Sequence, residues 1–225
     1  MKNVLFKRMA IVMVFAIAVT SCGGNNGNNS EMNANDNEKA TATQTISNKK
    51  LPFERGSYVQ VTKAMGIEIP TTVYFDKWGD WTATETKIEI IKGYPSHTIE
   101  IIKGKTHWNI DLIERTGTQY EAAGFSTGMA AALGASMGQK MAKDMEIEEL
   151  GTEDFLGYKS KKIRVKYKDM DMDVTTWNYD NLTMKMTGSM GKMDMFSEIL
   201  SIDLSAPPAS IFEVPDDVKI EVQKF

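Results

Sequence analysis

From residue 51 onward, apolar and polar residues alternate in short runs, and this period of two constrains the fold more than any other feature. Alternation rich in β-branched and aromatic residues indicates β-strands. Turn residues interrupt the runs so often that no room is left for the long crossovers that parallel strands need, and neighbouring strands are expected to be antiparallel. The expected strands span residues 57–63, 71–76, 81–91, 97–103, 106–113, 161–168, 173–179, 183–187, 198–204 and 218–223.

Residues 128–145 break the alternation with the run GMAAALGASMGQKMAKDM, which is rich in alanine and methionine. The run lacks β-branched residues and predicts a helix despite three glycines. The expected fold is therefore mainly β, an α+β arrangement in which a curved antiparallel sheet or incomplete β-barrel packs on this one principal helix. A second interpretation makes the helix a soft lid over an apolar cavity or a segment that touches a membrane, because methionine side chains adapt to varied shapes.

The chain begins with a pattern typical of an exported protein. Lys2, Lys7 and Arg8 form a basic region that precedes an uncharged stretch at 9–19, and small residues then precede Cys22, the only cysteine. The pattern resembles the lipobox of bacterial lipoproteins, which implies that residues 1–21 are a signal peptide and that Cys22 is acylated. Two or three acyl chains would make a lasting membrane anchor. By resemblance to Gram-negative sorting patterns, we expect retention at the outer membrane, facing the periplasm.

Composition then divides the rest of the chain. Residues 22–50 comprise the lipidated cysteine and a stretch rich in Asn, Gly and Thr, which predicts a disordered tether. Residues 51–225 have the length of a single half-barrel-like domain. Because the one cysteine is committed to lipid, this domain must be held together without a disulfide. The formal net charge is −4, and loss of the basic leader makes it more negative, which argues against nucleic acid as a partner.

The carboxyl half carries three motifs in a recognisable order. They are LGYKSKK at 156–162, TWNY at 176–179 followed by 182–188, and APPASIFEVP at 206–215. Their order resembles the LolA/LolB-like periplasmic lipoprotein-carrier superfamily, in particular single-domain lipoproteins of Gram-negative bacteria. The resemblance implies an incomplete antiparallel barrel around helices, with an apolar hollow for acyl chains. The chain departs from the best-known members in carrying its own lipid anchor and a mid-domain Gly/Met helix.

These observations predict a protein that binds an acyl chain, a lipid or another apolar ligand between sheet and helix. An alternative is a structural or docking lipoprotein with a solid core. A basic strand face includes Lys162 and Arg164, and it indicates either ordinary solvent-exposed surface or contact with anionic lipid headgroups. The expected lining of the hollow is Met129, Leu133, Met137, Met141, Trp177, Met184, Met186 and Phe196.

Chemistry beyond lipid binding has weaker support in the sequence. Five thioethers occur within twelve residues, and soft thioethers select Cu(I), so a copper site is a further alternative. The sequence GASMG at 134–138 fits the nucleophile elbow of hydrolases, but both histidines lie upstream of the serine, whereas that fold places its histidine last. We therefore expect a protein without catalytic activity or a cofactor. The candidate copper ligands are Met184, Met186, Met190, Met193 and Met195.

Overall fold

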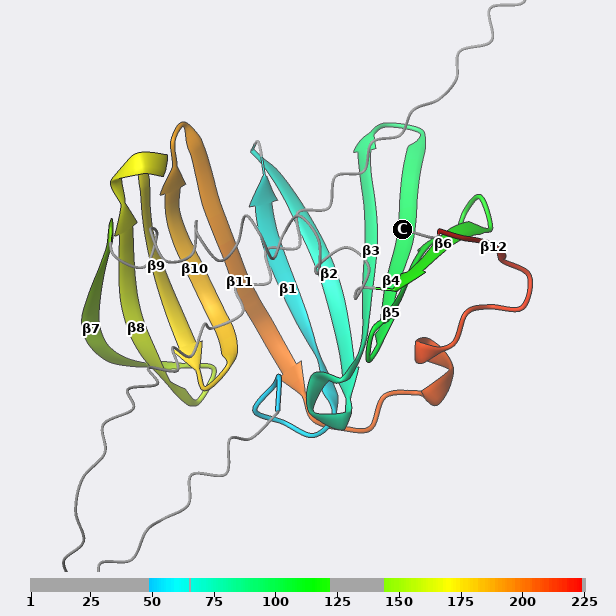
Figure 1. The fold of residues 1–225 in the computed structure, drawn as a ribbon, viewed down its shortest axis with the longest axis horizontal. Coiled ribbons are helices and arrows are strands. Elements are labelled where there is room, and N and C mark those ends of the chain that lie inside the picture. Colours follow the sequence, from blue (N-terminus) through cyan, green and yellow to red (C-terminus); the bar gives the residue numbers. More distant parts are fainter. Residues whose placement is uncertain (1–48, 65, 122–143, 224–225) are drawn as a thin grey trace, which may run out of the picture. The chain divides into compact units, whose positions relative to one another are not determined.

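The computed structural model describes residues 49–64, 66–121 and 144–223, all within one compact unit, Thr43–Phe225. These residues build one sheet of twelve strands (Figure 1). The strands are β1 (Gly56–Ala64), β2 (Ile67–Asp76), β3 (Trp81–Ile91), β4 (Tyr94–Lys103), β5 (Thr106–Asp111), β6 (Thr116–Glu121), β7 (Met145–Phe155), β8 (Tyr158–Tyr167), β9 (Met172–Tyr179), β10 (Leu182–Met190), β11 (Met193–Asp203) and β12 (Lys219–Val222). Three short 3-10 turns accompany them, namely η1 (Lys77–Gly79), η3 (Lys168–Met170) and η4 (Ala209–Phe212).

The order of the strands follows the chain in two passes. It runs β12-β6-β5-β4-β3-β2-β1-β11-β10-β9-β8-β7, so β1 to β6 extend in one direction and β7 to β11 return from the opposite edge to pair with β1. All neighbours are antiparallel except β12 and β6, which are parallel. The sheet is open, because β12 and β7 stand at the two ends of this order. Short connections join the antiparallel neighbours within each pass, from β1 to β6 and from β7 to β11.

The alternation located ten of these twelve strands, with shifts at their ends. The strand predicted at 81–91 is confirmed with the same bounds, and the one predicted at 198–204 begins earlier, at Met193. β6 and β7 were not predicted. β6 has the sequence TGTQYE, which lacks an aliphatic residue, and nine of the eleven residues of β7 are exposed, so neither strand shows a buried apolar row.

The predicted fold class, a sheet or incomplete barrel packed on one principal helix, is wrong. The described residues form an open twelve-stranded sheet, and apart from the helical residue Asp144 their helical elements are 3-10 turns of three or four residues. Residues 128–143 of the predicted helix lie outside the described residues, and Met145 opens β7 instead of closing a helix. In the described part of the chain, no helix is long and apolar enough to cross a membrane.

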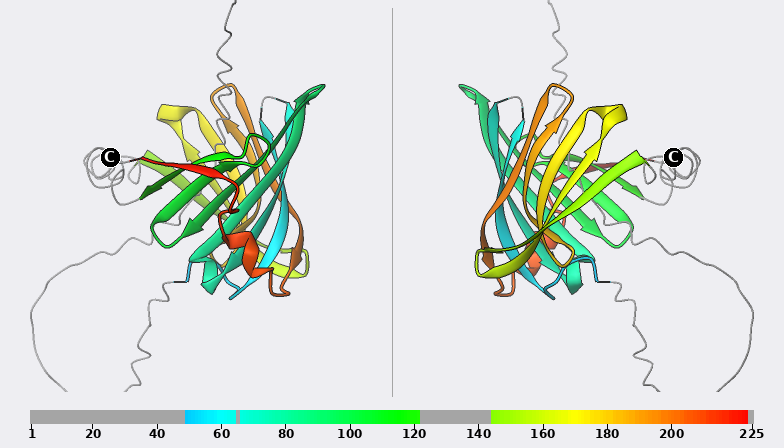
Figure 2. Two further views of the ribbon diagram at one scale, coloured as in Figure 1. Left: turned by 90° about the vertical axis from the view of Figure 1, so that its right-hand side faces the viewer. Right: turned by 90° about the vertical axis from the view of Figure 1, so that its left-hand side faces the viewer.

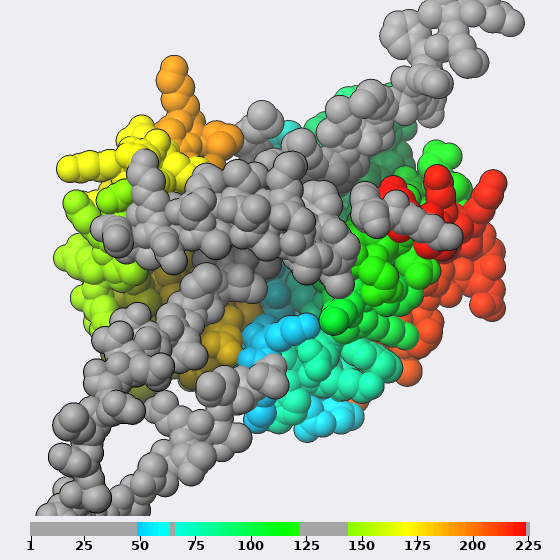
Figure 3. Space-filling view, in the orientation of Figure 1, coloured from blue at the N-terminus to red at the C-terminus, as the bar shows by residue number. Residues whose placement is uncertain are grey.

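Irregular chain from the carboxyl end covers one core of the sheet. Phe212 of η4 is 2% exposed and packs with buried residues of β3, β4 and β5, among them Ala83, Ile101 and Ile110. The Trp81 and Phe212 rings lie 6.1 Å apart. Figure 2 shows this segment, orange to red, lying across the green strands, and Figure 3 shows its red atoms directly against them. The carboxyl-terminal segment therefore packs on this face of the sheet, which is the role that was predicted for the helix at 128–145.

A second core lies where the amino-terminal end of the described chain meets the sheet. Leu182, Met184 and Ile199 are buried there, and Leu51 and Phe53 pack against them. Two backbone bonds hold this segment in place, since the amides of Lys50 and Leu51 both donate to the carbonyl of Trp78, at 3.0 Å. Burial of apolar side chains by short covering segments therefore stabilises both cores.

Candidate functional site

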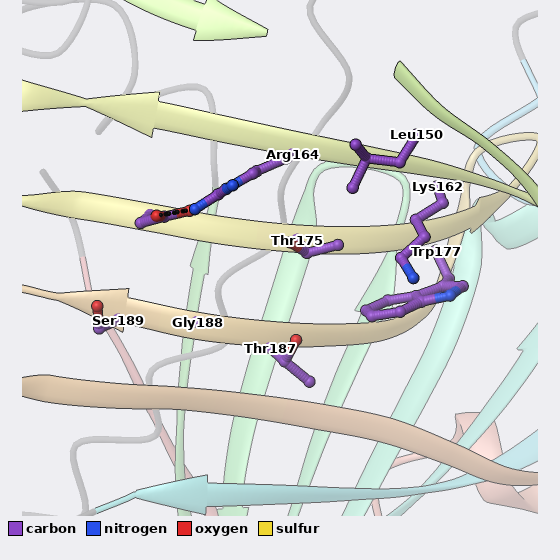
Figure 4. Close-up of a pocket in the computed structure, with 9 residues that line it drawn as sticks. Leu150, Lys162, Arg164, Thr175, Trp177, Thr187, Gly188 and Ser189 are labelled. Carbon is purple, nitrogen blue, oxygen red and sulfur yellow. Dashed lines mark hydrogen bonds and ion pairs between the residues drawn. The ribbon is translucent and has the colours of Figure 1, made fainter. Parts of the chain in front are cut away.

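A groove opens on the face formed by β8, β9 and β10, with a cavity volume of about 510 Å³ (Figure 4). Strand register explains how its side chains come together, because directly paired residues of antiparallel strands point to the same face. Trp177 of β9 pairs with Lys162 of β8 and with Lys185 of β10. The lining residues are Leu150, Lys162, Arg164, Asp173, Thr175, Trp177, Thr187, Gly188 and Ser189.

The Trp177 indole, half-buried, is the largest side chain of the groove. The Nζ atom of Lys162 lies 4.6 Å from the centre of the indole ring, and Nζ of Lys185 lies 5.7 Å from it. Both distances are within the range of a cation–π interaction. The indole N–H donates to Glu153, which also lies 3.4 Å from Lys162. This hydrogen bond from Trp177 holds the pKa of the Glu153 carboxyl below its usual value.

An arginine–aspartate pair closes one end of the groove. Nε of Arg164 donates to Asp173 at 2.7 Å, and the second guanidinium nitrogen donates to the other carboxylate oxygen at 2.6 Å. The hydrogen bonds from Arg164 lower the pKa of Asp173, and the same bonds raise the pKa of Arg164. Such a bidentate pair fixes the guanidinium plane. Because β8 and β9 carry one partner each, the pair also ties the two strands together.

Register places the predicted lining residues on different surfaces. Trp177 lines the groove, and Phe196 pairs with Thr187 and so lies on the same face, next to it. Met186 is 8% exposed and points to the opposite face, because it alternates with Lys185 and Thr187 along β10. Met184 is fully buried in the core beside Leu182. Four predicted lining residues lie outside the described residues, and they are Met129, Leu133, Met137 and Met141. Cys22 also lies outside them.

The sequence pointed to part of this groove and missed the rest. Trp177 was a predicted lining residue, and Lys162 and Arg164 belong to the basic strand face that the alternation showed. Thr187 and Ser189 were missed, because only the pairing of β9 with β10 places them beside Trp177. The alternation along β9, which puts Thr175 and Asp173 on the face of Trp177, was a signal that could have found two more members.

The groove offers contact surface and hydrogen bonds more than reactive groups. Its lining combines an indole and a leucine with three hydroxyl side chains and the charged Lys162, Arg164 and Asp173. No histidine or cysteine is among the nine lining residues, and the described part of the chain holds no group of three or more His, Cys, Asp or Glu residues that could bind a metal ion. The arrangement suits an amphiphilic ligand that has both an apolar and a polar part.

Comparison with known proteins identifies a similar fold but no family. No protein-family model and no curated protein matches the sequence. An uncharacterised conserved protein from Thermus thermophilus has a similar structure, with 11% sequence identity and a TM-score of 0.52 over 78% of this chain and 93% of that one. At this identity the likeness shows a shared fold alone, and the resemblance to the lipoprotein-carrier superfamily stays a prediction.

Two further solved structures are more distant. In the MucA/MucB complex of Pseudomonas aeruginosa, the matched chain is 10% identical, with a TM-score of 0.46 over 74% of this chain and 58% of that one. LprF from Mycobacterium bovis is 12% identical, with a TM-score of 0.35 over 73% and 90% of the two chains.

Proposed function

We propose that the protein is a non-catalytic, lipid-anchored envelope protein that binds a lipid or another amphiphile in the groove of β8, β9 and β10. One observation carries the proposal: the half-buried Trp177 indole lies in a cavity of about 510 Å³, between the ammonium groups of Lys162 and Lys185. Cavities of about 300–1,000 Å³ are typical of small-molecule sites. A large apolar ring beside polar groups matches the two parts of an amphiphile.

The apolar part of the ligand would lie on Trp177 and Leu150. Leu150 is 42% exposed in the bulge of β7, so both side chains have apolar surface that a ligand can cover. Each Å² of apolar surface removed from water contributes about 25 cal/mol. The hydroxyl groups of Thr175, Thr187 and Ser189 can donate hydrogen bonds to a polar headgroup at the same time.

The charges of the groove are largely balanced before any ligand binds. Lys162 lies 3.4 Å from Glu153, Lys185 lies 3.0 Å from Glu198, and Arg164 is bound to Asp173. An acidic headgroup would therefore compete with carboxylates that are already present. Recognition should depend on the indole and the hydroxyl groups more than on net charge, and binding should weaken only modestly with added salt.

The anchor rests on the lipobox pattern around Cys22. Acylation there would hold the domain at a membrane, facing the periplasm, where lipids are close at hand. Growth with radiolabelled palmitate should label the wild-type protein, and Cys22→Ser should remove the label and release the protein from the membrane fraction. A Cys22→Ser protein that stays labelled and membrane-bound would contradict the anchor without affecting the groove.

Binding is tested with a fluorescent fatty acid and the purified full chain. Trp177→Ala should weaken binding about tenfold, because removal of the indole takes away the main apolar contact, and tenfold corresponds to about 1.4 kcal/mol. The matched control is Ile91→Ala on β3, which removes an apolar side chain that is 65% exposed outside the groove. The control should bind like the parent.

Two outcomes would contradict lipid binding in the groove. One is equal affinity of the parent and Trp177→Ala, which would place the ligand elsewhere. The other is a parent that takes up no fatty acid and that native mass spectrometry shows without co-purified lipid. The second result would favour the alternative of a structural or docking lipoprotein.

A further inference from the structure

Strand register gathers methionines that are scattered in the sequence into one row. Met190 of β10 pairs with Met172 of β9 on one side and with Met193 of β11 on the other. Directly paired residues point to the same face, with Cβ atoms about 4.5–5.5 Å apart. Three thioethers from three neighbouring strands therefore stand side by side on the face opposite the groove.

Two more thioethers adjoin this row. Met195 follows Met193 by two residues, and Met186 precedes Met190 by four along a part of β10 without a register shift, so both point to the same face. Gly188 lies between Met186 and Met190 and pairs with Met195, and it adds no side chain to the space between them. We call these five residues, Met172, Met186, Met190, Met193 and Met195, the methionine patch.

The turns beside the patch are tied to each other. The amide of Gly191, in the turn between β10 and β11, donates to the carbonyl of Asp171 just before β9, at 2.9 Å. This bond fixes the turn that carries Met190 and Met193 against the residue that precedes Met172. The strand ends are thus held together, while the unbranched thioether side chains can still adjust their torsions.

Apolar packing alone does not account for the patch. Met186 is 8% exposed and serves as a core residue, but Met193 is 56% exposed and removes little apolar surface from water. Met172 and Met190 are only half-buried. A leucine would fill the same space, whereas a thioether also supplies a soft sulfur ligand.

We propose that Met172, Met190 and Met193 form a Cu(I) site, with Met195 as a neighbouring fourth thioether. Soft thioether ligands select Cu(I) over harder divalent ions. Their Cβ spacing and three rotatable bonds allow three sulfur atoms to converge on one ion. The site is independent of the groove, since it lies on the other face of the sheet, on β9, β10 and β11. Of the predicted copper ligands, Met184 takes no part, because it lies in the core at the bulge of β10.

The test uses the full chain with Cys22→Ser, because the thiol of an unacylated Cys22 would itself bind Cu(I). Cu(I) is supplied anaerobically in competition with the chromogenic chelator bicinchoninate. The parent should take one equivalent of Cu(I), and the combined variant Met172→Leu, Met190→Leu and Met193→Leu should bind it at least 100-fold more weakly. Met184→Leu is the matched control and should bind like the parent.

A second measurement does not depend on how the combined variant folds. Ag(I), a soft monovalent ion, should shift the methyl NMR signals of Met172, Met190 and Met193 in the parent and leave that of Met184 in place, whereas Zn(II) should shift none of the four. The proposal is overturned if the combined variant keeps the parent's affinity, if the parent binds no Cu(I), or if Ag(I) leaves the three signals unmoved.

Discussion

The two halves of one sheet face differ in what covers them. Strand pairing places residues of β9, β10, β11, β1, β2, β3 and β4 on this one face. The face runs from Trp177 through Glu198 and Val61 to Thr72 and Ile99. Over β3 to β5 the carboxyl-terminal segment seals this face with Phe212. Over β8 to β10 the same face carries the groove. We call these regions the sealed half and the groove half.

The difference teaches how the fold separates stability from binding. In the sealed half, alanine and isoleucine side chains face Phe212 and are almost completely buried. In the groove half, Lys162, Thr175 and Thr187 occupy equivalent outward positions around an indole that is only half-buried. Because burial in the sealed half contributes much of the folding free energy, the groove half can leave contact surface free for a ligand.

The largest expected effect comes from the seal itself. Phe212→Ala should lower the free energy of unfolding by about 4 kcal/mol, because the ring is nearly fully buried and its removal leaves a cavity. Trp177→Ala should lower it by less than about 1 kcal/mol, as for most changes outside a core. Urea unfolding followed by circular dichroism compares the two variants. Equal losses of unfolding free energy in the two variants would contradict the claim that the sealed half stabilises the fold more than the groove half does.

A glycine in the groove half should give the next largest effect. At Gly188 an added Cβ would lie 2.1 Å from the carbonyl oxygen of Asp173, and the backbone φ is +151°. Gly188→Ala should therefore push β9 and β10 apart and cost about 3 kcal/mol of stability. Gly93→Ala is the control, because a Cβ there meets nothing within 4 Å although its φ is also positive. If the two variants lower the thermal unfolding temperature equally, the close approach of the Asp173 carbonyl to Gly188 does not determine the loss of stability.

A third effect appears only at alkaline pH and reports on the second core. Burial raises the pKa of Tyr58 to about 12, so the folded protein keeps a phenol proton that the unfolded chain loses near pH 10. Stability should therefore fall by about 2 kcal/mol as the pH rises from 10 to 12. Tyr58→Phe should lack this part of the decrease. Urea unfolding at pH 9, 10, 11 and 12 measures it, and parallel curves for both proteins would contradict the burial of the phenol.

The smallest effect concerns the exposed pair of Arg164 and Asp173. Arg164 lowers the pKa of Asp173 in the folded protein, so the stabilisation is present above the ordinary aspartate pKa and is lost as the pH falls through the lowered value. Asp173→Asn should be slightly less stable than the parent at pH 7 and equally stable at pH 2. A difference that persists at pH 2 would mean that the pair acts through packing and not through charge.

Much of the sheet could be predicted from the sequence, while its cover and its groove could not. The alternation of β-branched residues located strands such as β3 and β9, because half-buried strands show their period directly. β7 escaped prediction because nearly all its side chains face solvent. The motif at 206–215 contains Phe212, but the packing of Phe212 on Ala83 and Ile101 is a contact between residues more than a hundred positions apart in the sequence. The groove required register, which period alone does not supply.

The most direct test of the central claim uses three of the four tryptophans as reporters of the two halves. Trp81 and Trp108 pack against the core of the sealed half, and Trp177 lies in the groove. Palmitate is titrated into ¹⁵N-labelled protein while the indole N–H signals are followed by NMR. We expect the Trp177 signal to shift in a saturable way while those of Trp81 and Trp108 stay in place. A saturable shift of Trp81 or Trp108 with an unmoved Trp177 would contradict the assignment of the groove half as the ligand surface.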